Sequence, residues 1–157
     1  MGRGMSLTLW MLQLVVTLLA SSVVVAVDGL AVVVETLNKG LGPPVTKAFR
    51  YESLVTLYME EDDGSKTPSG WSTRKSDGAK VDAPFAFQPG VNLIAGWSEG
   101  VVQMNEGERA LLHIPSHLGY GDVPMGSPGG AFYIPANSNL LFDIEILGKE
   151  GASTSEF

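Results

Sequence analysis

A single short helical stretch lies in the middle of this chain, between segments of strand-like composition. Its apolar residues, from Leu93 to Val101, recur at the spacing of one helical face, and Asn92 before them is a residue type suited to an N-cap. A helix this short is stable only when it packs against another element. The segments around it are rich in β-branched, aromatic or alternating apolar residues: Val32–Thr36, Arg50–Met59, Phe85–Phe87, Ala110–Ile114 and Leu140–Leu147. Because they do not alternate with further helices, the sequence predicts an α+β fold, in which an antiparallel five- to six-stranded sheet wraps around one short α-helix.

Two stretches between these segments have the composition of long loops. Thr67 to Asp82 is polar and contains Pro68, Gly70 and Gly78, with Trp71 as its one large apolar side chain. Leu118 to Asn139 is rich in glycine and proline beside aromatic residues. Loops of this length inside a compact domain commonly carry function, so we expect both to contribute to a site.

The first residues of the chain have the pattern of a secretory signal peptide. Arg3 precedes an apolar run from Leu7 to Ala20, and a Val-x-Ala triplet ends at Ala26. The sequence predicts a signal peptide at 1–26, a domain at 27–150 and a flexible C-terminal tail at 151–157. An uncleaved signal anchor is the alternative, since Leu7 to Val27 is just long enough to span a bilayer. We expect the protein in the secretory pathway, either in the endoplasmic reticulum lumen or secreted; a plastid reached through a bipartite leader and a membrane-anchored form are alternatives.

The charge balance and the absence of cysteine exclude several kinds of site. With 10 basic and 17 acidic side chains and a formal net charge of -7, the chain lacks the basic patch that nucleic-acid binding requires. Without cysteine there is no disulfide, thiolate metal site or cysteine nucleophile. His113 and His117 are separated by Pro115, which rules out a helical metal pair. We therefore expect no metal and no cofactor.

Several stretches, in one order and at similar spacing, resemble FKBP domains, the macrolide-binding immunophilins. They are Val34-Glu35-Thr36, Pro84-Phe85-Ala86-Phe87, Leu93 to Gly100, Gly107 to Ala110 leading to Gly119-Tyr120-Gly121, and Ile134-Pro135-Ala136-Asn137 leading to Leu140 to Leu147. This resemblance covers the chain from about Val32 to Lys149. It implies a peptidyl-prolyl cis-trans isomerase (rotamase) that assists protein folding by acting on X-Pro bonds of client polypeptides, and it implies macrolides as further ligands.

The resemblance also implies which residues form the substrate pocket. Trp97 would be its floor, Tyr120 would donate its hydroxyl to the substrate, and the backbone N–H of Ile94 would bind a carbonyl. The walls and rim would come from Phe85, Leu93, Ile134 and Phe142.

Two departures from the family pattern concern the pocket wall. In the strand before Asp63-Gly64, counting back from the turn puts Leu57 where the family has an aromatic residue, unless a bulge returns Tyr58 to the pocket. The family's Phe-Asp-Ser-Ser-like segment aligns with Thr67-Pro68-Ser69-Gly70, which lacks the pocket aspartate, so Asp77 or Asp82 would have to replace it. These departures leave a catalytically weak binding module for proline-containing partners as the alternative function.

Overall fold

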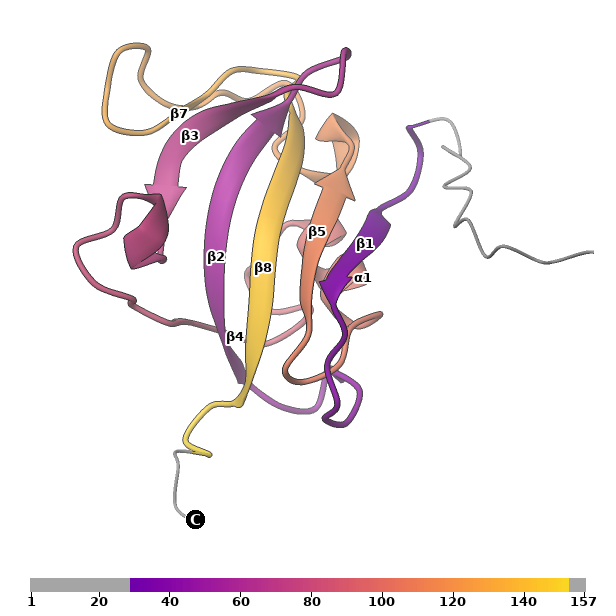
Figure 1. The fold of residues 1–157 in the computed structure, drawn as a ribbon. Helices are drawn as coiled ribbons and strands as arrows, with labels where there is room; N and C mark the ends of the chain where they lie inside the picture. Colours follow the sequence, from indigo (N-terminus) through magenta and orange to yellow (C-terminus); the bar gives the residue numbers. More distant parts are fainter. Residues whose placement is uncertain (1–28, 153–157) are drawn as a thin grey trace, which may run out of the picture.

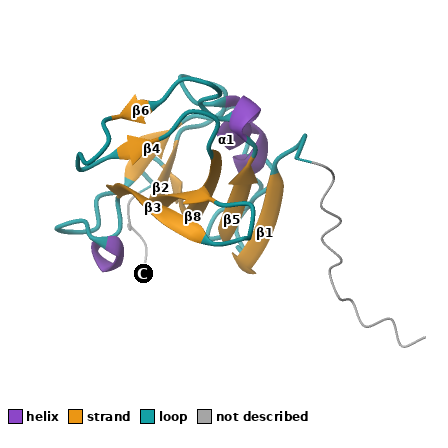
Figure 2. Cartoon of the chain, turned by 90° about the horizontal axis from the view of Figure 1, so that it is seen from above, coloured by secondary structure: helices purple, strands orange, loops and turns teal. Residues whose placement is uncertain are grey.

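The computed structural model describes residues 29–152; the expected signal peptide at 1–26 and most of the expected tail at 151–157 lie outside this range. Its main sheet has six antiparallel strands in the order β1-β5-β8-β2-β3, and β4 pairs with β2 off this path (Figure 1). The strands of this sheet are β1 (Val33–Asn38), β2 (Tyr51–Glu60), β3 (Lys66–Ser72), β4 (Phe85–Phe87), β5 (Arg109–Ile114) and β8 (Asn139–Lys149). Helix α1 (Ala95–Val101) lies on the concave side of the curved sheet (Figure 2). The predicted α+β fold is confirmed.

The two faces of the sheet follow from the alternation of side chains along β2 and β8. These strands pair over almost their whole length, with Leu57 opposite Phe142 and Thr56 opposite Asp143. Since successive side chains of a strand point to opposite faces, Leu57 and Phe142 share the inner face with the core, and Thr56 and Asp143 share the outer face. The helix packs only against the inner face, and the pocket described below lies between them.

Helix α1 begins later than its sequence pattern indicates. Asn92 has a φ of 52°, a left-handed conformation, and the residue at the N-cap is Ile94, which makes no side-chain capping bond. The expectation of an Asn92 N-cap is therefore wrong, because asparagine tolerates the left-handed region and here serves a bend in the chain. The helix then approaches the sheet closely at Gly96, where an added Cβ would lie 2.3 Å from Cγ2 of Ile114.

The polar stretch expected as one loop from Thr67 to Asp82 begins as strand β3 on the edge of the sheet. Pro68 lies opposite Tyr58 and Ser72 opposite Thr56, so β3 has extra residues between these pairs and bulges away from β2. An edge strand tolerates proline, and Gly70 takes a φ of 86° within the bulge. Only the remainder of the stretch is a loop, with one 3-10 turn, η1 (Lys75–Asp77).

The second expected loop contains a small hairpin of β6 (Met125–Gly126) and β7 (Tyr133–Ile134), and a 3-10 turn, η2 (Ser116–Leu118), precedes it. Residues near β7 contact the β3 bulge: an added Cβ on Gly70 would lie 1.8 Å from the carbonyl oxygen of Ala131. The two long connections thus meet at the edge of the sheet. Across residues 29–152, no helix combines the length and apolar character needed to cross a membrane.

Candidate active site

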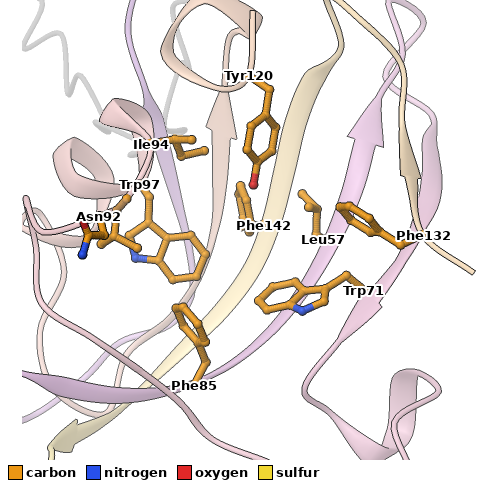
Figure 3. A pocket seen from close by; sticks show the side chains of 10 residues that line it. Leu57, Trp71, Phe85, Asn92, Ile94, Trp97, Tyr120, Phe132 and Phe142 are labelled. Carbon is orange, nitrogen blue, oxygen red and sulfur yellow. The ribbon is translucent and has the colours of Figure 1, made fainter. Parts of the chain in front are cut away.

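A hollow of about 390 Å³ opens between α1 and the inner face of the sheet. This volume lies within the range of small-molecule pockets. Ten residues, most of them apolar, line it: Leu57, Trp71, Phe85, Asn92, Leu93, Ile94, Trp97, Tyr120, Phe132 and Phe142. Six of them are aromatic, and they come from four elements and two loops. Trp71 belongs to β3, Phe85 to β4, Trp97 to α1 and Phe142 to β8, whereas Tyr120 and Phe132 lie in the long connection between β5 and β8. Figure 3 shows how these side chains surround the cavity.

Trp97 forms the floor of the hollow and is almost completely buried. Its ring centroid lies 4.8 Å from that of Phe142, 5.7 Å from Phe87 and 5.8 Å from Phe85, in edge-on arrangements. Such edge-to-face contacts are favoured by the ring quadrupoles and fix the orientation of the indole. A proline ring bound on this floor would therefore meet a rigid apolar surface.

Two hydrogen-bond donors lie at the rim of this apolar surface. The hydroxyl of Tyr120 points into the cavity, toward Phe142 and Leu57 (Figure 3). Burial raises the pKa of Tyr120 above its ordinary value of 10.0, so the hydroxyl stays protonated and able to donate at neutral pH. Ile94 accepts from the N–H of Ser98, while its own N–H has no backbone acceptor among the described residues. Both donors are free to bind carbonyl oxygens of a peptide.

The wall opposite Trp97 is formed by Trp71, which stands in the β3 bulge (Figure 3). The Trp71 and Phe85 rings meet edge-on, with centroids 5.8 Å apart and planes at 87°. The hydroxyl of Ser69 accepts from the N–H of Trp71 at 3.1 Å and donates to the carbonyl of Leu57 at 2.7 Å. The bulge is thus tied to β2, and this tie holds the indole over the cavity.

Comparison with known proteins identifies the group to which this pocket belongs. The family described as FKBP-type peptidyl-prolyl cis-trans isomerase matches residues 59–147. The chain belongs to this family. FK506-binding protein 1 of Gibberella zeae is 45% identical over 111 residues, which are 70% of this chain and 90% of the relative. A protein named peptidyl-prolyl cis-trans isomerase from Schizosaccharomyces pombe is 42% identical over 91 residues, 54% of this chain and 77% of the relative.

Solved structures of FKBPs have the same fold. The crystal structure of AtFKBP13 superposes with a TM-score of 0.59 at 30% identity, covering 75% of this chain and 92% of that one. The resemblance stated from the sequence is therefore confirmed, and membership in a family of isomerases favours an enzyme over a catalytically weak binding module.

The FKBP pocket of this chain has Leu57, and not Tyr58, on its β2 wall. The pairing of β2 with β8 is regular from Ser53 to Glu60, so no bulge in β2 rotates Tyr58 inward. Tyr58 lies on the outer face beside Thr56, and burial, followed by the charges of Asp77 and Asp143, raises its pKa. The alternative that placed Tyr58 in the pocket is wrong, because the only irregularity near it belongs to β3.

The structure also relocates the Phe-Asp-Ser-Ser-like segment of the FKBP pattern. The aromatic residue that reaches the pocket from β3 is Trp71, four residues after the position expected at Thr67, and the next residue is Ser72. No carboxylate lines the pocket within residues 29–152. Asp77 instead accepts from Thr56 on the outer face at 2.6 Å, and Asp82 accepts from the N–H of Lys75 at 2.8 Å. Neither aspartate reaches into the pocket.

Most of the residues expected in the pocket do line it, but Ile134 does not. Phe85, Leu93, Ile94, Trp97, Tyr120 and Phe142 are all pocket residues together with Leu57. Ile134 is fully buried in the core, and Phe132, two residues earlier, reaches the pocket in its place. Ile134 was expected from the family pattern alone, and in the structure it belongs to the core cluster. Sequence reasoning missed Phe132, Asn92 and Trp71; for Trp71 the signal was a lone large apolar side chain in a polar stretch.

Proposed function

We propose that this pocket binds the proline ring of X-Pro segments in client polypeptides and catalyses their cis-trans isomerisation, thereby assisting the folding of those clients. The barrier to rotation is about 18–20 kcal/mol because resonance stabilises the planar amide. No covalent bond breaks, so the reaction requires neither a nucleophile nor a metal ion. The observation that carries the proposal is the rigid aromatic floor at Trp97 beneath the free hydroxyl of Tyr120.

The chemistry of the pocket fits the twisted amide better than the planar one. Twisting reduces charge separation across the amide, so an apolar cavity stabilises the twisted state relative to water. The Tyr120 hydroxyl and the Ile94 N–H would donate hydrogen bonds to the carbonyls that flank the X-Pro bond. These bonds would hold the peptide in one orientation while the amide rotates, which lowers the entropic part of the barrier. Each tenfold gain in rate corresponds to about 1.4 kcal/mol, a magnitude that packing and orientation supply.

An exchange assay on an X-Pro peptide tests the proposal. The purified protein at micromolar concentration should accelerate cis-trans exchange measured by NMR, in which no coupling protease is needed. A rate equal to the uncatalysed one would end the enzymatic claim. Relatives of this chain are named FK506-binding proteins, and we propose that FK506 occupies the same pocket and inhibits the exchange competitively. Inhibition that excess peptide does not relieve would contradict a shared site.

We further propose that the protein acts in the secretory pathway, in the endoplasmic reticulum lumen or outside the cell. The support is the sequence pattern of Arg3, the apolar run from Leu7 to Ala20 and the small residue Ala26. N-terminal sequencing of the protein from its native cell is the test. A first residue at Val27 is expected, and a start at Met1 would favour the signal anchor instead.

A further inference from the structure

A second hollow, of about 360 Å³, adjoins the proline pocket at the β3 bulge. Its lining consists of Thr56, Leu57, Tyr58, Pro68, Gly70, Trp71, Ser72, Asp77, Gly78 and Ala79. Leu57 and Trp71 line both hollows, so the two hollows meet where these residues lie, beside the β3 bulge. The second hollow exists because β3 departs from β2 between the Pro68 and Ser72 pairs while η1 closes over the gap. Thr56 and Tyr58 belong to the outer face of the sheet, so the second hollow opens on the far side of the bulge from the first, and the shared edge at Trp71 is where a polypeptide bound in the first hollow would reach it.

Asp77 gives the second hollow an anionic group without an ion-pair partner. Its carboxylate is exposed and accepts a hydrogen bond from the hydroxyl of Thr56 at 2.6 Å, which fixes its position. No Lys or Arg nitrogen of the described residues lies within ion-pair distance of Asp77, because Arg74 is bound to Glu145 and Arg109 to Asp143. At longer range its charge contributes to raising the pKa of Arg109, but no side chain of the described residues makes a direct ion pair with it, so the carboxylate is open to direct contact with a ligand.

Aromatic rings supply a second feature that attracts cations. Tyr58 and Trp71 both line the hollow, and the ring faces of such side chains carry partial negative charge. The ammonium group of Lys66 already lies 4.4 Å from the centroid of the Tyr58 ring, so Tyr58 is engaged by a cation of this chain and Trp71 is the ring that remains for a ligand. A carboxylate beside aromatic rings is the combination that suits a lysine or arginine side chain with its apolar stem.

We infer that the second hollow binds the lysine or arginine side chain of a client polypeptide whose proline occupies the first hollow. This specificity rests on the proposed isomerase function of the same site. The long apolar stem of the basic residue packs on Trp71, and its charged end meets Asp77. The net charge of -7 favours the approach of cationic segments but does not by itself select a position within them.

Matched peptides test the inference. Lysine, its uncharged analogue norleucine, and glutamate are placed in turn at each position from two residues before to two residues after a single proline, and exchange is measured by NMR. At one position or more, the lysine peptide should exceed the norleucine peptide about three- to five-fold in kcat/KM, mainly through a lower KM.

Asp77→Asn should abolish this preference for lysine, since the amide oxygen still accepts from Thr56 but carries no charge. The preference of the unaltered protein should also shrink as salt is raised, because screening weakens exposed charge pairs.

Asp62→Asn is the matched control, because it removes the same charge at the exposed tip of the β2–β3 hairpin. It should leave the lysine preference intact. Equal loss in both variants would mean steering by net charge and would overturn the site, as would a preference that survives Asp77→Asn or that is absent at every position. If even the norleucine peptides exchange at the uncatalysed rate, the proposed function fails and the inference with it. A melting temperature of Asp77→Asn equal to that of the unaltered protein would show that the loop carrying Asp77 is intact. The salt series tests the same contact without any substitution.

Discussion

At the scale of single residues, the pocket compensates for a missing aromatic side chain with another one from a different strand. Leu57 leaves the β2 wall without a ring, and Trp71 covers the adjacent space from the β3 bulge. Because Trp71 meets Phe85 edge-on and Phe85 meets Trp97, the rings form one continuous packed set. The aromatic character of the site is thus retained although one of its usual sources is absent.

Tyr120 yields a prediction about pH. Burial raises the pKa of its hydroxyl above the ordinary value of 10.0 because the phenolate is disfavoured in the apolar pocket. A raised pKa means that the donating, neutral form persists below pH 10 and is lost only as the pH rises through the higher value. We therefore expect kcat/KM to be flat from neutral pH up to the ordinary tyrosine value and to decline only above it.

Tyr120→Phe separates this hydroxyl from other groups that titrate at alkaline pH. Loss of one hydrogen bond should lower kcat/KM about three- to ten-fold at neutral pH, and the alkaline decline should disappear. The measurement is the NMR exchange rate of one peptide across the pH range, with folding checked by circular dichroism at each point. A decline of the same shape in Tyr120→Phe would assign it to another residue.

At the scale of elements, the β3 bulge determines where Trp71 and the β6–β7 hairpin lie. Gly70 combines a φ of 86° with a backbone neighbour so close that a Cβ would lie 1.8 Å from the carbonyl oxygen of Ala131. No flexible side chain is available to yield, so the strand or the hairpin loop has to move. Gly70→Ala should therefore lower the free energy of unfolding by about 2 kcal/mol or more, and should reduce kcat/KM because the adjacent Trp71 is displaced.

Gly64→Ala is the matched control for this prediction. Gly64 has a similar φ of 80° in the β2–β3 turn, but an added Cβ there would meet no atom within 4 Å. Gly64→Ala should lower the free energy of unfolding by only about 1 kcal/mol, the cost of placing alanine in the left-handed conformation, and should leave kcat/KM unchanged. Denaturant unfolding and peptide exchange measure the two effects. Equal losses in the two variants would show that contact with the hairpin loop is not what Gly70 provides.

The elements that the sequence predicts well are those whose apolar residues follow a regular period. Apolar side chains recur toward one buried face along β2, β5 and β8. The sequence therefore predicts the positions of these strands, and the count along β2 also places Leu57 at the pocket. β3 was missed because an edge strand with a bulge needs no alternating apolar pattern and tolerates Pro68 and Gly70. The number of extra residues in a bulge depends on pairing with β2, so the place of Trp71 follows from tertiary structure and not from local sequence.

At the scale of the whole molecule, the outer face of the sheet holds a layer of charges that ties the loop after β3 to β2 and β8 and ties β8 to β5. Arg74 is almost fully buried and donates to Glu145 of β8 at 2.9 Å and to the carbonyl of Leu54 of β2 at 3.1 Å. Arg109 of β5 binds both carboxylate oxygens of Asp143, at 2.9 and 2.8 Å. The reactive surface is thus on the inner face, and the charges that anchor its wall are on the outer face.

Arg74→Met tests this division of the molecule between its faces. The variant leaves Glu145 without its partner and the carbonyl of Leu54 without a donor, and it removes the 3.7 Å contact of Arg74 with Asp143. Asp143 keeps its paired contact with Arg109. Removing one member of a buried ion pair commonly costs about 3–5 kcal/mol, and the partial exposure of Glu145 reduces this to about 2–3 kcal/mol here.

Arg50→Met is the control, because Arg50 pairs with Glu150 where both side chains are largely exposed, and it should change the unfolding free energy little. Well below the melting temperature, Arg74→Met should still isomerise an uncharged peptide, since none of its contacts reaches the Trp97 floor. Denaturant unfolding of both variants decides the first point, and a stability of Arg74→Met equal to that of Arg50→Met would show that the outer charge layer does not hold the loop.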